Sequence, residues 1–177
     1  DGSKIVVGGF EILAIIDTKT WQIREADMAK FAEKNVNLFS WKVAVSPDQK
    51  TIAVGNWGGE VVLVDAETLA INHIFRAHQA NVKSLAFSPD GNTLATASWD
   101  RTVKFIDPKR WEVSNELKGH FAGVHELAYS PKGDMLMTAG GDFNVNLWNA
   151  KSVGRSNAIF LQSPFVMYND DASTAIG

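Results

Sequence analysis

Two histidines are each followed, at the same distance in the sequence, by an aspartate. Histidine and aspartate together can carry out acid–base chemistry. Asp100 follows His78 by 22 residues and Asp142 follows His120 by 22 residues, and a threonine precedes each aspartate by four. A His–Thr–Asp set could relay a proton to a nucleophile. Because the set recurs in register with two expected strand turns, we interpret it as a structural device and predict no catalytic residue.

The rest of the sequence contains no pattern that is typical of a metal, phosphate or nucleic-acid site. The chain has four His and no Cys, and its net charge is −3. No carboxylate cluster has metal-ligand spacing, no Gly-rich phosphate loop occurs, and the basic residues form no stripe. No apolar run reaches the roughly 18 residues of a membrane helix. We therefore expect no cofactor, metal or membrane partner and argue against nucleic acid. The composition favours a soluble, intracellular protein without fixing its compartment.

The chain contains an internal repeat. Similar segments begin at Asp1, Asp48, Asp90 and Lys132, and a fifth begins at Asp171, in steps of 47, 42, 42 and 39 residues. Each segment joins a polar turn to a short run of small and β-branched residues, such as DGNTLATAS in the third copy. A period near 42 is typical of one four-stranded propeller blade.

Turn markers recur in phase with this period. A Ser-Pro pair follows an apolar run at 46–47, 88–89 and 130–131, and proline ends a strand because it lacks an N–H. A polar turn later in each repeat ends on one large apolar residue, which we expect to pack beside the turn: Trp21, Leu69, Trp111 and Val153. Strands are expected at 52–54, 61–64, 82–87, 102–106, 124–129 and 145–148, and several of them are apolar on both faces. This pattern predicts sheets sandwiched between neighbouring sheets.

Residues 25–34 interrupt the pattern where the first repeat is longest. Met28, Phe31 and Ala32 recur at helical spacing among good helix formers. We expect a short helix or ordered loop here, which is either a tolerated insertion or a binding element on one face.

These markers together resemble the WD-repeat (WD40) family over essentially the whole chain. In that family a blade starts near Gly-His and ends near Trp-Asp. Ala77-His78 and Gly119-His120 match the starts, and partial matches to the ends are Val64-Asp65, Ile106-Asp107 and Trp148-Asn149. The resemblance implies an all-β fold, a β-propeller built of four-stranded antiparallel blades.

The resemblance also implies a buried hydrogen-bond chain in each blade. The fourth repeat has the complete set: His120, Thr138, Asp142 and Trp148. The third repeat keeps His78, Thr96 and Asp100, with Ile106 in place of Trp. The second repeat has Val36, Val54, Gly58 and Val64 at these positions, so we expect apolar packing alone to hold that blade.

We interpret residues 1–177 as one propeller segment of about four blade-equivalents. It begins after the first strand of one blade and reaches the opening strands of another near 165–169. Three arrangements remain open: part of a seven- or eight-bladed ring, half of a homodimeric four-plus-four ring, or four blades closing alone. Open blade edges and apolar blade faces would favour self-association.

The expected function is a non-catalytic scaffold that binds proteins or peptides through the propeller rim. The resemblance places the following candidate partner-binding residues there: Trp41, Trp57, Trp99, Gln79, Asn81, Lys83, Phe121 and His125. The three Trp could form an aromatic patch or could pack against neighbouring loops. The alternative is a propeller module of a larger enzyme or redox-cofactor protein whose activity lies outside this segment.

Overall fold

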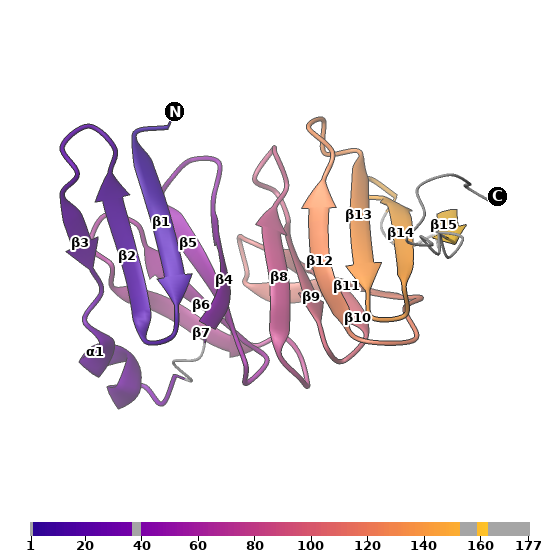
Figure 1. The fold of residues 1–177 in the computed structure, drawn as a ribbon, viewed down its shortest axis with the longest axis horizontal. Helices are drawn as coiled ribbons and strands as arrows, with labels where there is room; N and C mark the ends of the chain where they lie inside the picture. Colours follow the sequence, from indigo (N-terminus) through magenta and orange to yellow (C-terminus); the bar gives the residue numbers. More distant parts are fainter. Residues whose placement is uncertain (1, 37–39, 153–158, 163–177) are drawn as a thin grey trace, which may run out of the picture.

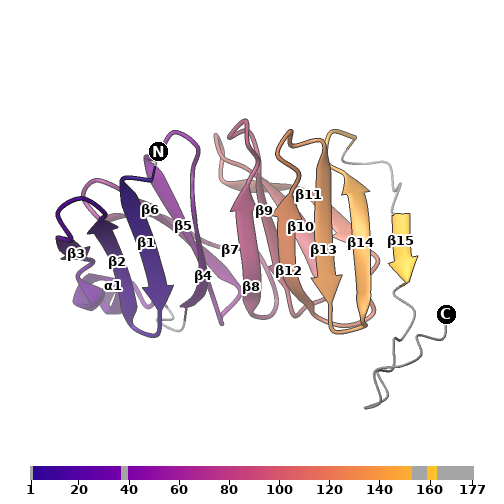
Figure 2. The ribbon, with the colours of Figure 1, turned by 45° about the horizontal axis from the view of Figure 1, so that its top comes forward.

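The chain folds into four antiparallel sheets that follow one another in sequence order (Figures 1 and 2). The computed structural model describes residues 2–36, 40–152 and 159–162. The first sheet has three strands: β1 (Lys4–Gly9), β2 (Ile12–Asp17) and β3 (Ile23–Glu25). The all-β prediction is confirmed: four sheets of three or four strands and one short helix are consistent with propeller blades.

The other three sheets have four strands each, and in each the strands pair in chain order. The second contains β4 (Ser40–Val45), β5 (Thr51–Asn56), β6 (Glu60–Asp65) and β7 (Ile71–Arg76). The third contains β8 (Val82–Phe87), β9 (Leu94–Ser98), β10 (Thr102–Asp107) and β11 (Glu112–Lys118). The fourth contains β12 (Val124–Tyr129), β13 (Met135–Gly140), β14 (Asn144–Asn149) and β15 (Ile159–Gln162). The expected strands near 165–169 and the repeat beginning at Asp171 lie outside the described residues.

The Ser-Pro pairs build the turn between the first two strands of each full sheet. The hydroxyl oxygens of Ser46, Ser88 and Ser130 each accept, at 3.0 Å, a backbone N–H from the residue at or directly before the start of the second strand. The serine side chain thus provides an acceptor for a backbone N–H that is not paired between the strands. The same bond in three copies explains why serine recurs at this step of the repeat.

The turn before the last strand of each of the first three sheets holds its large apolar residue in left-handed backbone. Trp21, Leu69 and Trp111 have φ of 58°, 58° and 57°. Leu69 is buried and Trp111 half-buried, because each packs in the core against the preceding sheet. The expected packing is wrong for Trp21, which is 72% exposed, because no described sheet precedes β1–β3. Val153 lies outside the described residues.

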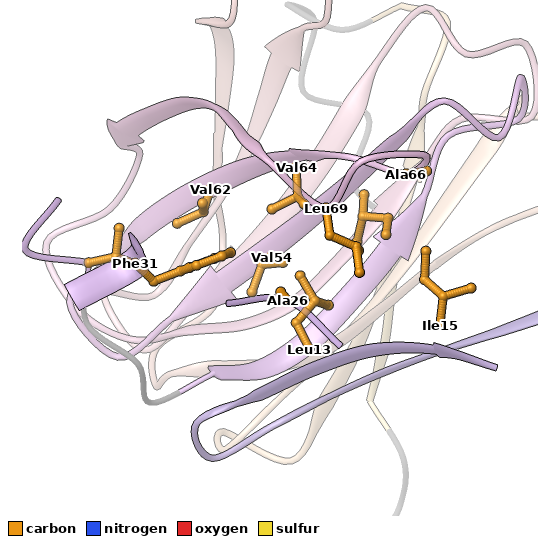
Figure 3. Packing of buried hydrophobic residues seen from close by; sticks show 11 residues of the cluster. Leu13, Ile15, Ala26, Phe31, Val54, Val62, Val64, Ala66 and Leu69 are labelled. Atoms are coloured by element: carbon orange, nitrogen blue, oxygen red, sulfur yellow. The ribbon is translucent and has the colours of Figure 1, made fainter. Parts of the chain in front are cut away.

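The hydrophobic cores lie between successive sheets. In the first core, Leu13 and Ile15 of β2 meet Val54, Val62 and Val64 of the second sheet (Figure 3). Two further cores of the same kind lie between the second and third sheets and between the third and fourth. Apolar residues on both faces of the strands are therefore required, since inner sheets have a neighbour on each side.

The insertion in the first repeat forms a short helix, α1 (Met28–Glu33). The Asp27 carboxylate caps it by accepting the N–H of Ala29 at 3.1 Å. The helix is shorter than the expected 25–34 because Glu25 belongs to β3. Phe31 is 5% exposed and packs into the first core, so α1 covers one end of that core (Figure 3).

Candidate protein-binding rim

A buried chain of hydrogen bonds links the strands of the fourth sheet to the loop that precedes it. The Trp148 indole N–H donates to Thr138 Oγ1 at 2.9 Å, and Thr138 Oγ1 lies 2.8 Å from His120 Nε2. His120 Nδ1 lies 3.0 Å from Asp142, which also accepts the N–H of Phe121 at 2.8 Å. The polar atoms thus find partners away from water, which stabilises and rigidifies the loop.

The third sheet has the same arrangement without the indole. His78 Nδ1 lies 2.9 Å from Asp100, and His78 Nε2 lies 2.8 Å from Thr96 Oγ1. Asp100 also accepts the N–H of Gln79 at 3.0 Å. Ile106, where Trp would stand, is fully buried in the apolar core between the second and third sheets. The structure therefore brings together each sequence-predicted set of network residues.

Burial explains why these sets are unsuited to nucleophilic chemistry. Thr96 and Thr138 are 0% exposed, so neither hydroxyl can reach a substrate from solvent. In the second sheet the corresponding positions carry Val54 and Val64, both buried in the first core with Val36. That blade is accordingly packed with apolar side chains where its neighbours use hydrogen bonds.

The two aspartates titrate well below their ordinary range. Burial alone would raise the pKa of Asp142, but the backbone N–H of Phe121 and the His120 ring outweigh it and lower that pKa to about 2. Burial also opposes the shift at Asp100, yet His78 and Thr102 hold its pKa still further down. Both carboxylates therefore stay charged at neutral pH and keep the adjacent loop anchored.

A β-bulge lies near the start of the first strand in all three full sheets. The register shifts between Ser40 and Lys42, between Val82 and Ser84, and between Val124 and Glu126. The skipped residues are three predicted partner-binding positions: Trp41, Lys83 and His125. A bulge leaves one residue outside the ladder and re-aims its side chain. The backbone of these three residues thus occupies an equivalent position in each full sheet.

Trp99 is the centre of a small cluster between the third and fourth sheets. Lys83 Nζ lies 4.8 Å from the centroid of the Trp99 ring, and the His125 ring meets Trp99 edge-on with centroids 6.3 Å apart. A Cβ at Gly123 would lie 2.8 Å from Trp99 Cδ1, so the glycine admits the indole. Trp99 is still 49% exposed, which combines a packed edge with an accessible surface.

The other predicted binding residues are distributed along the same rim. Trp57 is 42% exposed in the β5–β6 turn, and Phe121 is 81% exposed beside His120. Gln79 is exposed, whereas Asn81 is half-buried and its backbone carbonyl accepts the backbone N–H of Trp99 at 3.0 Å. Trp41 is placed on β4 by its backbone, and its side chain lies outside the described structure.

Two aromatic residues at this rim were not predicted from the sequence. Phe10, 60% exposed, occupies in the β1–β2 turn the position of Trp57 and Trp99 in the next two repeats. Phe143, 76% exposed, lies in the corresponding turn of the fourth sheet. The spacing of 47 and then 42 residues that joins Phe10, Trp57 and Trp99 was available as a signal. Helix α1 lies at the same edge of the molecule as the β1–β2 turn (Figure 1).

Comparison with known families gives two adjacent matches. Residues 70–107 and 111–149 each match the WD40 family, described as WD domain, G-beta repeat. Each match takes in the last strand of one sheet and the first three of the next, β7–β10 and β11–β14. No curated protein matches the chain.

Two absences bear on other kinds of site. Within the described residues, no group of three or more His, Asp or Glu side chains could hold a metal ion. None of the helices in that part of the chain is long and apolar enough to cross a membrane.

Proposed function

We propose that this chain is a non-catalytic scaffold acting through this rim, because residues 70–107 and 111–149 match the WD40 family, whose domains generally bind other proteins and are typically non-catalytic. The observation that carries the proposal is the row of accessible aromatic side chains at one step of the repeat. Phe10, Trp57 and Trp99 occupy equivalent turns and are each 42–60% exposed. Tryptophan and its aromatic neighbours supply large contact area at low entropic cost, which is typical of binding hot spots.

Charge around Trp99 favours an acidic partner. Lys83 and Arg101 lie at this part of the rim, with Lys83 directly over the Trp99 ring. The nearby carboxylates of Asp100 and Asp142 are engaged by the buried histidines and by loop N–H groups. A peptide that places an apolar side chain beside Asp or Glu would match both the indole and the cations.

The test is selection of binding peptides from a displayed random library against the folded chain. We expect the selected peptides to combine acidic and apolar residues, and their affinity to fall with rising salt. A W99S/F121S variant should bind the strongest synthetic peptide at least ~30-fold more weakly, the scale of a lost hot spot.

A matched control removes an exposed apolar residue away from the rim. Val113 on the outer strand β11 is 42% exposed, so V113S loses a comparable accessible side chain. Peptide affinity should be the same for V113S and the unsubstituted chain. Peptides that bind W99S/F121S as tightly as the parent would refute the rim as the binding surface.

A further inference from the structure

The outer face of the first sheet is apolar and accessible. Strand alternation directs Ile5, Val7, Ile16 and Ile23 away from the first core, and Trp21 of the β2–β3 turn completes this face, at the position that Leu69 has in the next repeat. Ile5 is 46% exposed, Trp21 72% and Ile23 59%. These residues are named below as the β1–β3 outer face. They belong to the body of the sheet and are separate from the aromatic rim.

The same positions are covered in the second and third sheets. Ile52, Val54, Val64 and Leu69 correspond to Ile5, Val7, Ile16 and Trp21, and they are 0–8% exposed. They pack in the first core against the preceding sheet. One repeat later, Leu94 and Ile106 are also fully buried, and half-buried Trp111 packs beside them in the second core. Within the chain, such a face is therefore covered by the facing side of the neighbouring sheet.

A face of the covering type is available on the fourth sheet. In the second sheet the covering residues are Ala44, Ala53 and Leu63, and in the third they are Ala86, Ala95 and Phe105. Their counterparts in the fourth sheet are Ala128, Met137 and Leu147, which are named below as the β12–β14 outer face. Met137 is 46% exposed, whereas Ala53 and Ala95 are 0% exposed.

We propose that the β1–β3 outer face of one chain packs against the β12–β14 outer face of a second copy, head to tail. The contact continues the interface that the chain already makes three times between its own sheets, with residues of the same kind at the same positions. Two such contacts related by a twofold axis would close two chains into one ring, because each chain carries one face of each type. Burial of the apolar residues supplies the driving force.

The test is the solution mass of the folded chain, measured by light scattering behind a sizing column. The chain mass is 19.4 kDa, and we expect twice this value at micromolar concentration. I5K places a charge on one face and M137E places a charge on the other, at side chains that are both 46% exposed. Each variant alone should keep its circular-dichroism spectrum and have the single-chain mass. An equimolar mixture of the two should regain the doubled mass, since one of its two interfaces is unaltered.

The control and the contrary outcomes distinguish this proposal from the proposed peptide binding at the rim. F121S alters an 81% exposed rim residue and should leave the mass doubled. A single-chain mass for the unsubstituted chain would overturn the proposal. If I5K dissociated the dimer and M137E did not, the contact would join two β1–β3 outer faces, which also overturns the head-to-tail arrangement. A single-chain mass with a lower melting temperature for I5K would assign the face to another segment of the same chain and would equally overturn it. None of these results alters peptide binding at the rim, so the two proposals can fail separately.

Discussion

Lys42 and Glu126, 84 residues apart in the sequence, form an ion pair with Nζ and Oε2 separated by 2.8 Å. Ser84, midway between them in sequence, donates its hydroxyl to the other oxygen of Glu126 at 2.5 Å. All three residues stand third in the first strand of successive full sheets, directly after the bulge. Burial tends to raise the pKa of Glu126, but Lys42 and Ser84 outweigh it and lower that pKa. One position of the repeat thus connects three sheets.

The first prediction concerns the strength of this connection. The side chains of Lys42 and Glu126 are 44% and 54% exposed, so we expect a coupling free energy below about 1 kcal/mol that weakens with salt. A double-mutant cycle with K42M, E126Q and the double variant, followed by urea unfolding at low and high salt, measures it. In E126Q the amide oxygen can still accept the hydrogen bond of the buried Ser84 hydroxyl, so this variant should keep part of the stabilisation. E126A removes that acceptor and should lose it. A coupling that is indifferent to salt would contradict the ion pair as its source.

The second prediction follows from a pair of residues that change together between repeats. A Cβ at Gly119 would lie 2.9 Å from Trp148 Cη2, whereas the corresponding positions in the previous repeat are Ala77 and Ile106. G119A should therefore destabilise the chain by roughly 1–3 kcal/mol through overpacking. In a W148I background the same substitution should cost much less, because that pair already occurs one repeat earlier. Chemical denaturation of the four members of the cycle measures the difference, and additive free energies would contradict the contact.

Much of the fold was predictable because its signals recur. The Ser-Pro pairs predicted strand ends, and the serine hydroxyl closes the turn at 3.0 Å in each full sheet. The 22-residue spacing from His78 to Asp100 and from His120 to Asp142 predicted which residues come together. A repeat identifies such pairs because the same distance in sequence serves the same turn each time.

The rest depended on neighbours that no local pattern contains. Trp21 shares its turn and its left-handed φ with Leu69 and Trp111, yet its exposure differs because burial is set by the adjacent sheet. The local sequence of its turn does not distinguish it from its equivalents. The bulge that re-aims Lys83 and His125 was likewise invisible, since it follows from strand pairing rather than residue type.

The third prediction concerns the Asp142 carboxylate. It accepts hydrogen bonds from the His120 ring, the Phe121 N–H and the Asn144 N–H. D142A leaves these donors without a partner in a buried site, so we expect a loss of roughly 1–3 kcal/mol in the free energy of unfolding. D142N keeps one acceptor oxygen and should lose less. Thermal and urea unfolding of both variants measure this, and a D142A chain that melts like the parent would remove the network from the forces that hold the blade.

The fourth prediction is the pH dependence of that contribution. The pKa of Asp142 is lowered from 3.8 to about 2 in the folded chain. A depressed pKa contributes stability that is fully present above about pH 4 and is lost as the pH falls towards 2, because the unfolded chain takes up the proton first. The lowered pKa of Asp142 corresponds to a contribution of roughly 2 kcal/mol above pH 4.

The comparison of the parent with D142N isolates this residue from the other carboxylates, whose titration is common to both chains. Urea unfolding at steps from pH 6 to pH 2 should show a difference in stability that is constant above pH 4 and shrinks below it. If the difference stayed constant down to pH 2, Asp142 would titrate alike in the folded and unfolded chains, and its hydrogen bonds to His120 and Phe121 could not be what anchors the loop at the rim.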